Sequence, residues 1–214
     1  MPESVLGPRD VVVVEGPDAV RYVHSQVSQD VAAMAVGETR WTFVLDPTGK
    51  VEVLARVQRT GEARLELDTD AGFGDALKAR LDRFKIRVKA ETSLHARAIE
   101  GARDEAARVA FGWPAMGLEI VPGDTLVAGT GLSKVAVSFT KGCYPGQELV
   151  ERMDSRGATP PRALRRVRVA DGAAAGDPVT DPDGTKVGVL TTVAGGHALA
   201  WVTRGHDVGE PIAF

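Results

Sequence analysis

The first ninety residues alternate between strand and helix patterns, and this order limits the possible fold more than any other feature. Four consecutive valines at residues 11–14 predict a buried strand, and residues 17–28 carry a broad apolar face that predicts a helix. Residues 39–45 and 50–59 flank Asp-Pro-Thr-Gly, a sequence that suits a tight turn, so they predict a hairpin. Residues 64–68 alternate between apolar and charged side chains and predict a third antiparallel strand.

Three further segments complete this unit. Residues 71–84 have apolar side chains at helical spacing and basic residues toward the C-terminal end, which predicts a helix. Residues 86–90 predict a closing strand, and residues 28–34 a short helical turn. The order strand, helix, three strands, helix, strand is typical of α+β folds with antiparallel pairing. We therefore predict a ferredoxin-like part with one extra strand over residues 1–91.

The rest of the chain predicts two smaller parts. Residues 92–158 have a looser pattern, with a helix expected over 104–111 and a short apolar strand or turn over 135–139. Residues 159–214 contain short apolar strands separated by Gly, Asp and Pro turns, without a helical period, and predict a small β-barrel. A unit of about 50 residues buries little surface alone, so we expect it to pack on the other parts.

The composition excludes several classes of protein. The 214 residues are 43% hydrophobic and 26% charged, which is ordinary for a globular protein. The net charge of −3 gives no reason to expect nucleic acid or an anionic membrane as a partner. No apolar run reaches the length of about 18 residues that a membrane span needs. Residues 1–4 lack the features of a signal peptide, so we expect a cytoplasmic protein.

The counts of cysteine and histidine limit the chemistry. The single cysteine excludes an internal disulfide framework, and it excludes an iron–sulfur cluster ligated by the cysteines of this chain alone. The four histidines are scattered without the spacing of metal ligands. We therefore predict no metal site.

The only cysteine lies in the stretch 141–148, Lys-Gly-Cys-Tyr-Pro-Gly-Gln-Glu, where potentially reactive groups are most concentrated. Pro145 suits the first position of a helix, which would place Gln147 and Glu148 in the first turn. Cys143 would then lie just before the helix and two residues from Lys141. A helix N-terminus and a nearby cation both favour the thiolate form of cysteine.

Two interpretations of this cysteine follow. In the first, Cys143 is an accessible thiol of lowered pKa at the edge of a pocket, and Gly142 and Gly146 let a ligand or another backbone approach closely. In the second, Cys143 is a small buried hydrophobic residue. No histidine lies nearby in the sequence to act as its base, so acyl transfer by a Cys–His pair is not supported.

The stretch Lys-Gly-Cys-Tyr-x-Gly-Gln-Glu resembles the signature of the YgfZ-type folate-binding proteins. These are relatives of the glycine-cleavage aminomethyltransferase (T-protein) and are linked to the assembly or repair of iron–sulfur clusters. Other segments that resemble the family are residues 16–31, 47–50, 112–114, 137–140, 155–157 and 188–192. The resemblance therefore spans nearly the whole chain.

The resemblance implies a three-part fold around a central cavity in which tetrahydrofolate can bind, with iron–sulfur proteins as possible clients. It makes Cys143 and Lys141 the catalytic candidates. The residues it implies for cofactor binding are Gly142, Tyr144, Gly146, Gln147, Glu148 and Arg152, with Arg156 as a weaker neighbour. A pterin edge needs a carboxylate or amide partner, and a glutamyl tail needs Lys or Arg.

Two departures from the pattern keep three functions open. Many relatives carry Pro-Ala-Glu-Thr-Gly-Leu before the signature, whereas residues 127–132 read Val-Ala-Gly-Thr-Gly-Leu, with Gly129 in place of the acidic residue. The Tyr-Thr-Gly-Glu segment of the T-protein has no counterpart. The chain is then a folate-linked accessory protein for iron–sulfur enzymes, an aminomethyltransferase-like enzyme with Asp46 as the nearest candidate carboxylate, or a binding scaffold without activity.

Overall fold

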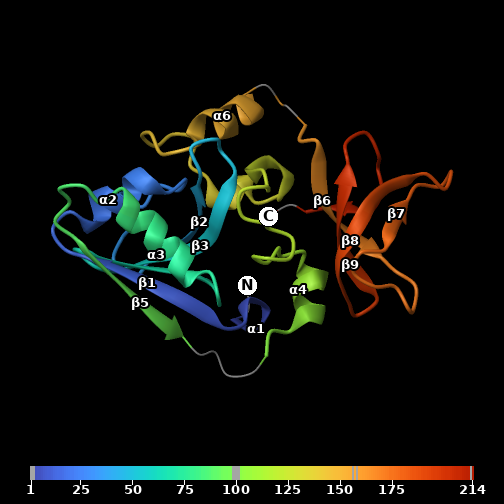
Figure 1. Ribbon diagram of the computed structural model, residues 1–214, viewed down its shortest axis with the longest axis horizontal. Helices are drawn as coiled ribbons and strands as arrows, with labels where there is room; N and C mark the ends of the chain where they lie inside the picture. Colours follow the sequence, from blue (N-terminus) through green and yellow to red (C-terminus); the bar gives the residue numbers. More distant parts are fainter. Residues whose placement is uncertain (1–2, 98–101, 156, 158, 213) are drawn as a thin grey trace.

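Two five-stranded antiparallel sheets lie at opposite sides of the molecule, with a segment of loops and short helices between them (Figure 1). The computed structural model describes residues 3–97, 102–155, 157, 159–212 and 214. The architecture is therefore α+β, as the sequence predicts. No helix in the described part of the chain is long and apolar enough to cross a membrane.

The N-terminal sheet has the strand order β2-β3-β4-β1-β5, and neighbouring strands are antiparallel. Its strands are β1 (Arg9–Glu15), β2 (Thr39–Leu45), β3 (Val51–Gly61), β4 (Arg64–Asp70) and β5 (Glu91–Arg97). Helices α2 (Ala19–Gln26) and α3 (Gly74–Arg83) cover one face (Figure 1). Without the edge strand β2, the order is that of a ferredoxin-like sheet, so the predicted extra strand is confirmed at this edge.

The core between this sheet and its two helices follows from the apolar pattern of the sequence. Val12 and Val14 of β1 point into it, together with Tyr22 and Val23 of α2 and Leu77 of α3. All five side chains are buried. The helical and strand periods therefore place their apolar faces as the sequence predicts.

The predicted strand over residues 86–90 is wrong, because the chain bends at Ile86 and Arg87 and residues 88–90 form no regular structure. Arg87 has a left-handed backbone with φ 58°, which a strand cannot accommodate. The carboxylate of Asp18 accepts a hydrogen bond from the Lys89 N–H at 2.9 Å, and the Asp18 N–H donates to the Lys89 carbonyl at 3.2 Å. The strand is instead β5, so this sheet extends to Arg97, beyond residue 91, where the sequence placed the end of the first part.

The predicted helical turn over residues 28–34 is confirmed only as a single turn, in which the Met34 N–H donates to the Val31 carbonyl at 3.4 Å. The Ser28 N–H donates to the Phe43 carbonyl at 2.9 Å, and the Ser28 hydroxyl donates to the Ala136 carbonyl at 2.6 Å. These partners on β2 and in the middle segment replace the hydrogen bonds that a helix would form at Ser28, so the chain bends at residues 28–29 and turns only at 32–33.

The middle segment holds the short helices α4 (Glu105–Phe111), the 3-10 helix η1 (Val127–Gly129), α5 (Ser133–Ala136) and α6 (Gln147–Ser155). The N-terminal helix α1 (Glu3–Leu6) packs near α4. The helix predicted over 104–111 is confirmed as α4. Asp104 caps it by accepting a hydrogen bond from the Ala107 N–H at 2.9 Å, and Gly112 ends it with a left-handed backbone, φ 82°.

The C-terminal sheet has the strand order β10-β6-β9-β8-β7. Its strands are β6 (Arg162–Arg168), β7 (Pro178–Thr180), β8 (Lys186–Ala194), β9 (His197–Thr203) and β10 (Glu210–Pro211). Among the described residues β10 and β7 are its free edges, and the sheet does not close on itself. The predicted barrel is therefore not confirmed.

A buried ion pair joins the middle segment to the C-terminal sheet. The side chains of Arg108 on α4 and Glu119 are fully buried, and an Nη of Arg108 lies 2.8 Å from the Glu119 carboxylate. The hydroxyls of Thr191 and Thr192 on β8 donate to the same carboxylate at 2.8 and 2.6 Å, and the Ala115 N–H donates to it at 3.0 Å. This network fixes β8 against the middle segment and so positions the surfaces that lie between them.

Candidate functional site

Residues 141–146 of the signature form a loop that packs against the β2–β3 hairpin, and Gln147 and Glu148 begin α6 (Figure 1). Gly146 has φ +80°, and a Cβ atom built on it would lie 2.4 Å from the Asp46 carbonyl oxygen. Gly49 has φ +87°, and its Cβ would lie 2.9 Å from the Gly146 carbonyl oxygen. The two turns therefore meet backbone to backbone. The close approach expected at Gly146 is made by the hairpin of the protein itself.

Lys141 ties this loop to the end of helix α2. Its ammonium group donates to the carbonyl oxygens of His24 and Val27, the latter at 2.6 Å, and lies 5.0 Å from the centre of the Tyr144 ring. Cations are favourable at helix C-termini, where carbonyl groups lack partners within the helix. Among the described residues these contacts account for the ammonium group, so its visible role is to anchor the loop.

Burial lowers the pKa of Lys141 to about 8, against a smaller opposing effect of the Asp30 carboxylate. The pKa of lysine in an unfolded chain is near 10.5, so between pH 8 and 10 the unfolded state binds more protons than the folded state. We expect the stability of the protein, relative to that of a Lys141→Met variant, to rise with pH across this window. Urea unfolding of both proteins at pH 7, 8, 9 and 10 measures it; a difference that stays flat or falls contradicts the assignment.

Tyr144 and Gln147 fix the other side of the loop. Tyr144 is buried, and burial, with the Glu151 carboxylate, raises the pKa of its phenol to about 12. Its hydroxyl has no hydrogen-bond partner among the described residues. Its N–H donates to the side-chain oxygen of Gln147 at 3.1 Å, and the Gln147 N–H donates back to the Tyr144 carbonyl at 3.3 Å. The Gln147 amide also donates to the Glu151 carboxylate.

Cys143 and Gly142 stand exposed between these anchors. A Cβ atom on Gly142 would meet nothing within 4 Å. The helix begins at Gln147 and not at Pro145, because Pro145 and Gly146 form the turn against the hairpin. The buried alternative for Cys143 is therefore wrong. Its thiol is displayed in a loop that is held on both sides.

The remaining signature residues face away from this loop. Glu148 lies in the first turn of α6, as predicted, and both Glu148 and Arg152 are exposed on the helix surface. Arg156 lies outside the described residues. The structure thus brings Lys141, Tyr144 and Gln147 together, displays Gly142 and Cys143, and leaves the charged residues of α6 in solvent.

Asp46, the candidate carboxylate for a transfer reaction, is occupied as a turn residue. Its carboxylate accepts hydrogen bonds from the Thr48 N–H at 2.8 Å, the Thr48 hydroxyl at 2.7 Å and the Lys50 N–H at 3.0 Å. Burial acts to raise the pKa of Asp46, but these hydrogen bonds outweigh it and the pKa is lowered. Such an Asx turn shapes the hairpin and leaves little basicity for proton transfer.

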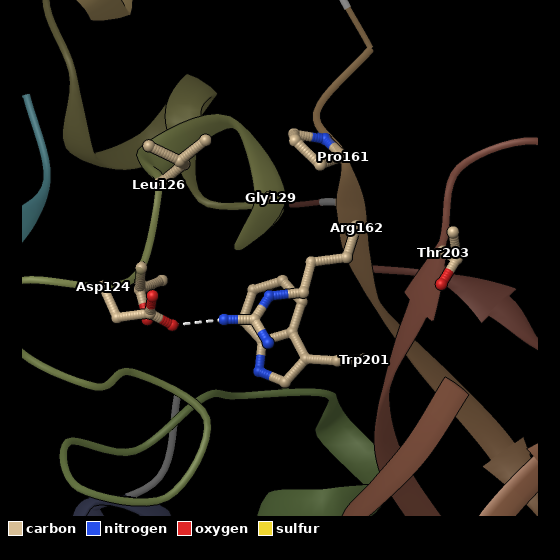
Figure 2. Close-up of a pocket in the computed structure, with 8 residues that line it drawn as sticks. Asp124, Leu126, Gly129, Pro161, Arg162, Trp201 and Thr203 are labelled. Atoms are coloured by element: carbon tan, nitrogen blue, oxygen red, sulfur yellow. Dashed lines mark hydrogen bonds and ion pairs between the residues drawn. The ribbon is translucent and has the colours of Figure 1, made fainter. Parts of the chain in front are cut away.

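A pocket of about 460 Å³ lies between residues 124–129 and strands β6 and β9 (Figure 2). It is lined by Asp124, Thr125, Leu126, Gly129, Pro161, Arg162, Trp201 and Thr203. The guanidinium carbon of Arg162 lies 5.2 Å from the centre of the Trp201 ring, and the guanidinium pairs with the Asp124 carboxylate. The sequence alone does not identify these three residues. Asp124 lies in a loop, and Arg162 and Trp201 lie on two strands and are 39 positions apart, so no periodicity links them.

Gly129 explains one departure from the family signature. A Cβ atom at this position would lie 2.8 Å from the Arg162 carbonyl oxygen and 3.0 Å from the Trp201 ring. The edge of the indole and the backbone of β6 thus occupy the space of any side chain at residue 129. An acidic side chain at residue 129, which the sequence resemblance implies, has no space in this arrangement. The carboxylate that lines the pocket is that of Asp124.

The predicted absence of a metal site is not contradicted. In the described part of the chain, no group of three or more His, Cys, Asp or Glu side chains is placed to hold a metal ion. His24 contacts the signature loop through its carbonyl oxygen, which accepts a hydrogen bond from Lys141. The His24 Nδ1 lies 3.3 Å from the Asp30 carboxylate and accepts from the Ala32 N–H. Burial, together with the charge of Lys141, lowers the pKa of His24.

Comparison with known proteins gives a likeness of fold. No protein-family model matches the sequence, and no curated protein sequence matches it. Among solved structures, the chain is similar to the glycine cleavage system aminomethyltransferase T from Bartonella henselae, with a TM-score of 0.78 and 18% sequence identity. The match covers 91% of this chain and 76% of that protein. The chain therefore has a T-protein-like fold.

Proposed function

We propose that the protein is a folate-binding accessory protein that acts in the maturation or repair of iron–sulfur enzymes, with Cys143 as its functional thiol. The fold supports a relationship to folate-dependent aminomethyltransferases. The signature residues supply the thiol, and the resemblance of that signature to the YgfZ-type proteins supplies the link to iron–sulfur enzymes.

The observation that carries the proposal is the way Cys143 is presented. The residues on both sides of it are held: Lys141 by two carbonyl groups of α2, Tyr144 by burial, and Gly146 by the hairpin turn. The thiol between them is exposed. An exposed loop that only connects two elements needs no such anchoring, whereas a reactive group is more effective when its position is fixed in advance.

The count of cysteines sets the form that this activity takes. Iron–sulfur clusters are held by four protein ligands, and this chain has one cysteine. Cys143 therefore acts on a cluster or a cluster protein in a shared or transient contact, with the other ligands supplied by the client. This agrees with a helper role and not with storage of a cluster.

The chain offers a suitable place for a folate-type ligand outside the signature. Tyr144, Gly146 and Gln147 are engaged in packing and helix capping, and Glu148 and Arg152 lie on an open helix surface, so the signature itself does not form a cradle. The 460 Å³ pocket is within the range of about 300–1,000 Å³ that small-molecule sites have. It combines an indole, a guanidinium and a carboxylate, which match an aromatic ring system with carboxylate and amide edges.

Aminomethyl transfer is the second candidate, and the geometry favours binding over transfer. Transfer needs a carboxylate that is basic enough to activate the folate nitrogen, whereas the hydrogen bonds of its own turn, all made to one oxygen of the Asp46 carboxylate, lower the pKa of that group. We therefore expect the protein to bind tetrahydrofolate without catalysing glycine-dependent methylene transfer.

Isothermal titration with tetrahydrofolate tests the ligand. We expect saturable binding with a dissociation constant below about 1 mM. The Cys143→Ser variant is expected to bind equally well, because Cys143 does not line the pocket. No binding at millimolar concentration contradicts the folate part of the proposal. Turnover in a glycine-dependent transfer assay shows the second candidate to be right instead.

A further inference from the structure

The pocket between residues 124–129 and strands β6 and β9 has a chemistry that the fold likeness does not specify. We propose that it binds a ligand that has a planar aromatic ring and, linked to it, a carboxylate, and that Arg162 is the cation that holds the carboxylate. This assignment deepens the proposed function, and the identification of the ligand as a folate rests on that function. The pocket takes the aminobenzoyl-glutamate end of the folate, not the pterin end.

Arg162 presents the charge that this ligand needs. Its side chain is 47% exposed, and its hydrogen-bond partner among the described residues is Asp124. A guanidinium carries five N–H donors in a planar fork that matches the two oxygens of a carboxylate. One partner leaves donors of Arg162 available to a ligand.

Trp201 holds Arg162 in place and provides the aromatic floor. The indole is 7% exposed, and its N–H donates to the Glu119 carbonyl at 3.1 Å, so the ring cannot turn freely. Its edge abuts Gly129. Figure 2 shows the Arg162 side chain lying over the indole, with its end toward Asp124. Guanidinium and aromatic groups both attract planar rings, so a planar ligand ring can contact this pair.

Asp124 occupies the position that a ligand carboxylate would take. Its side chain is 57% exposed, and exposed ion pairs of this kind contribute little to stability. A carboxylate from solution can therefore replace Asp124 as the partner of Arg162 at small cost. Leu126 and Pro161 add apolar surface to the same pocket.

Calorimetric titration with two matched probes tests the assignment: 4-aminobenzoyl-glutamate, which has carboxylates, and 4-aminobenzamide, which has none. We expect the first to bind at least about tenfold more tightly, because a hydrogen-bonded charge pair is lost in the second. Arg162→Gln is expected to abolish this difference. Arg168→Gln is the control, because it removes the same charge from an exposed residue of the same strand that does not line the pocket.

Asp124→Asn tests whether a ligand carboxylate replaces Asp124 as the partner of Arg162. If a ligand carboxylate replaces Asp124, the variant binds 4-aminobenzoyl-glutamate severalfold more tightly than the unaltered protein. Weaker binding by Asp124→Asn, or equal binding by Arg162→Gln and Arg168→Gln, overturns the inference. Urea unfolding of each variant shows whether it is folded. Arg162→Lys keeps the charge but loses the planar fork of the guanidinium, so we expect it to bind 4-aminobenzoyl-glutamate with intermediate affinity.

The outcomes also distinguish this inference from the proposed function. Tetrahydrofolate that binds the unaltered protein and Arg162→Gln equally well supports folate binding and overturns the role of Arg162. Binding of 4-aminobenzoyl-glutamate that depends on Arg162, without binding of tetrahydrofolate, supports the pocket and removes folate as its ligand.

Discussion

Replacing Glu119 with alanine is expected to lower the free energy of unfolding by about 3–5 kcal/mol. The substitution removes the fully buried one of the two carboxylates that pair with the Arg108 guanidinium and leaves only that of the partly exposed Glu105. It also removes an acceptor of the Thr191 and Thr192 hydroxyls. Removing one partner of a buried ion pair is costly because the other charge stays in a medium that solvates it poorly. Single domains are stable by about 5–15 kcal/mol, so much of the stability depends on this network.

Urea unfolding measures this loss, and a double-mutant cycle assigns it. Arg108→Ala is expected to cost a similar amount, and the variant with both substitutions much less than the sum, because neither charge is then left alone. Arg165→Ala is the control, since its partner Asp207 is almost fully exposed, and it should cost at most about 1 kcal/mol. A loss below about 1 kcal/mol for Glu119→Ala would show that the network does not hold the C-terminal sheet in place.

The second large effect is expected at Gly146. An alanine there would adopt φ +80° and place its Cβ 2.4 Å from the Asp46 carbonyl oxygen, a contact that side chains do not tolerate. Strain of the left-handed backbone and overpacking together are expected to cost about 2–4 kcal/mol. The loop must then leave the hairpin, and the anchoring of the residues around Cys143 is lost.

Gly142→Ala is the matched control for this substitution. It lies in the same loop, has open space around it, and is expected to change stability by at most about 0.5 kcal/mol. Urea unfolding measures both variants. Trypsin, followed by mass spectrometry of the cut after Lys141, reports on the loop, because cleavage requires local opening. Equal stability and equal cleavage of the two variants would show that the contact with the hairpin does not fix the loop.

The strands and helices that carry regular patterns could be predicted from the sequence, whereas segments shaped by distant partners could not. The valines of β1 and the Asp-Pro-Thr-Gly turn are local signals, and both gave the structure observed. Strand β5 is largely polar and lies at a sheet edge, so it lacks the apolar alternation of a buried strand. Ser28 bonds to Ala136, a residue 108 positions away, and no local pattern announces such a contact.

The same division applies to the candidate site. The signature identified Cys143, and its exposure agrees with a functional thiol. The sequence could not show that Lys141 bonds to helix α2 and not to a ligand, because its partners are 114 and 117 positions away. Arg162 and Trp201 carry no local signal that distinguishes them from other residues of short strands. Their importance follows only from the position of Asp124 opposite them.

The most direct test of the account is to replace Cys143 with serine in cells that lack their own copy of the protein, and to assay iron–sulfur enzymes. Thr140→Ala, a neighbouring exposed position, is the control, with all variants present at equal levels. If Cys143 is the functional thiol, Cys143→Ser leaves these activities as low as in cells without the protein, while Thr140→Ala restores them. Full restoration by Cys143→Ser would contradict it and reduce the thiol to a surface residue.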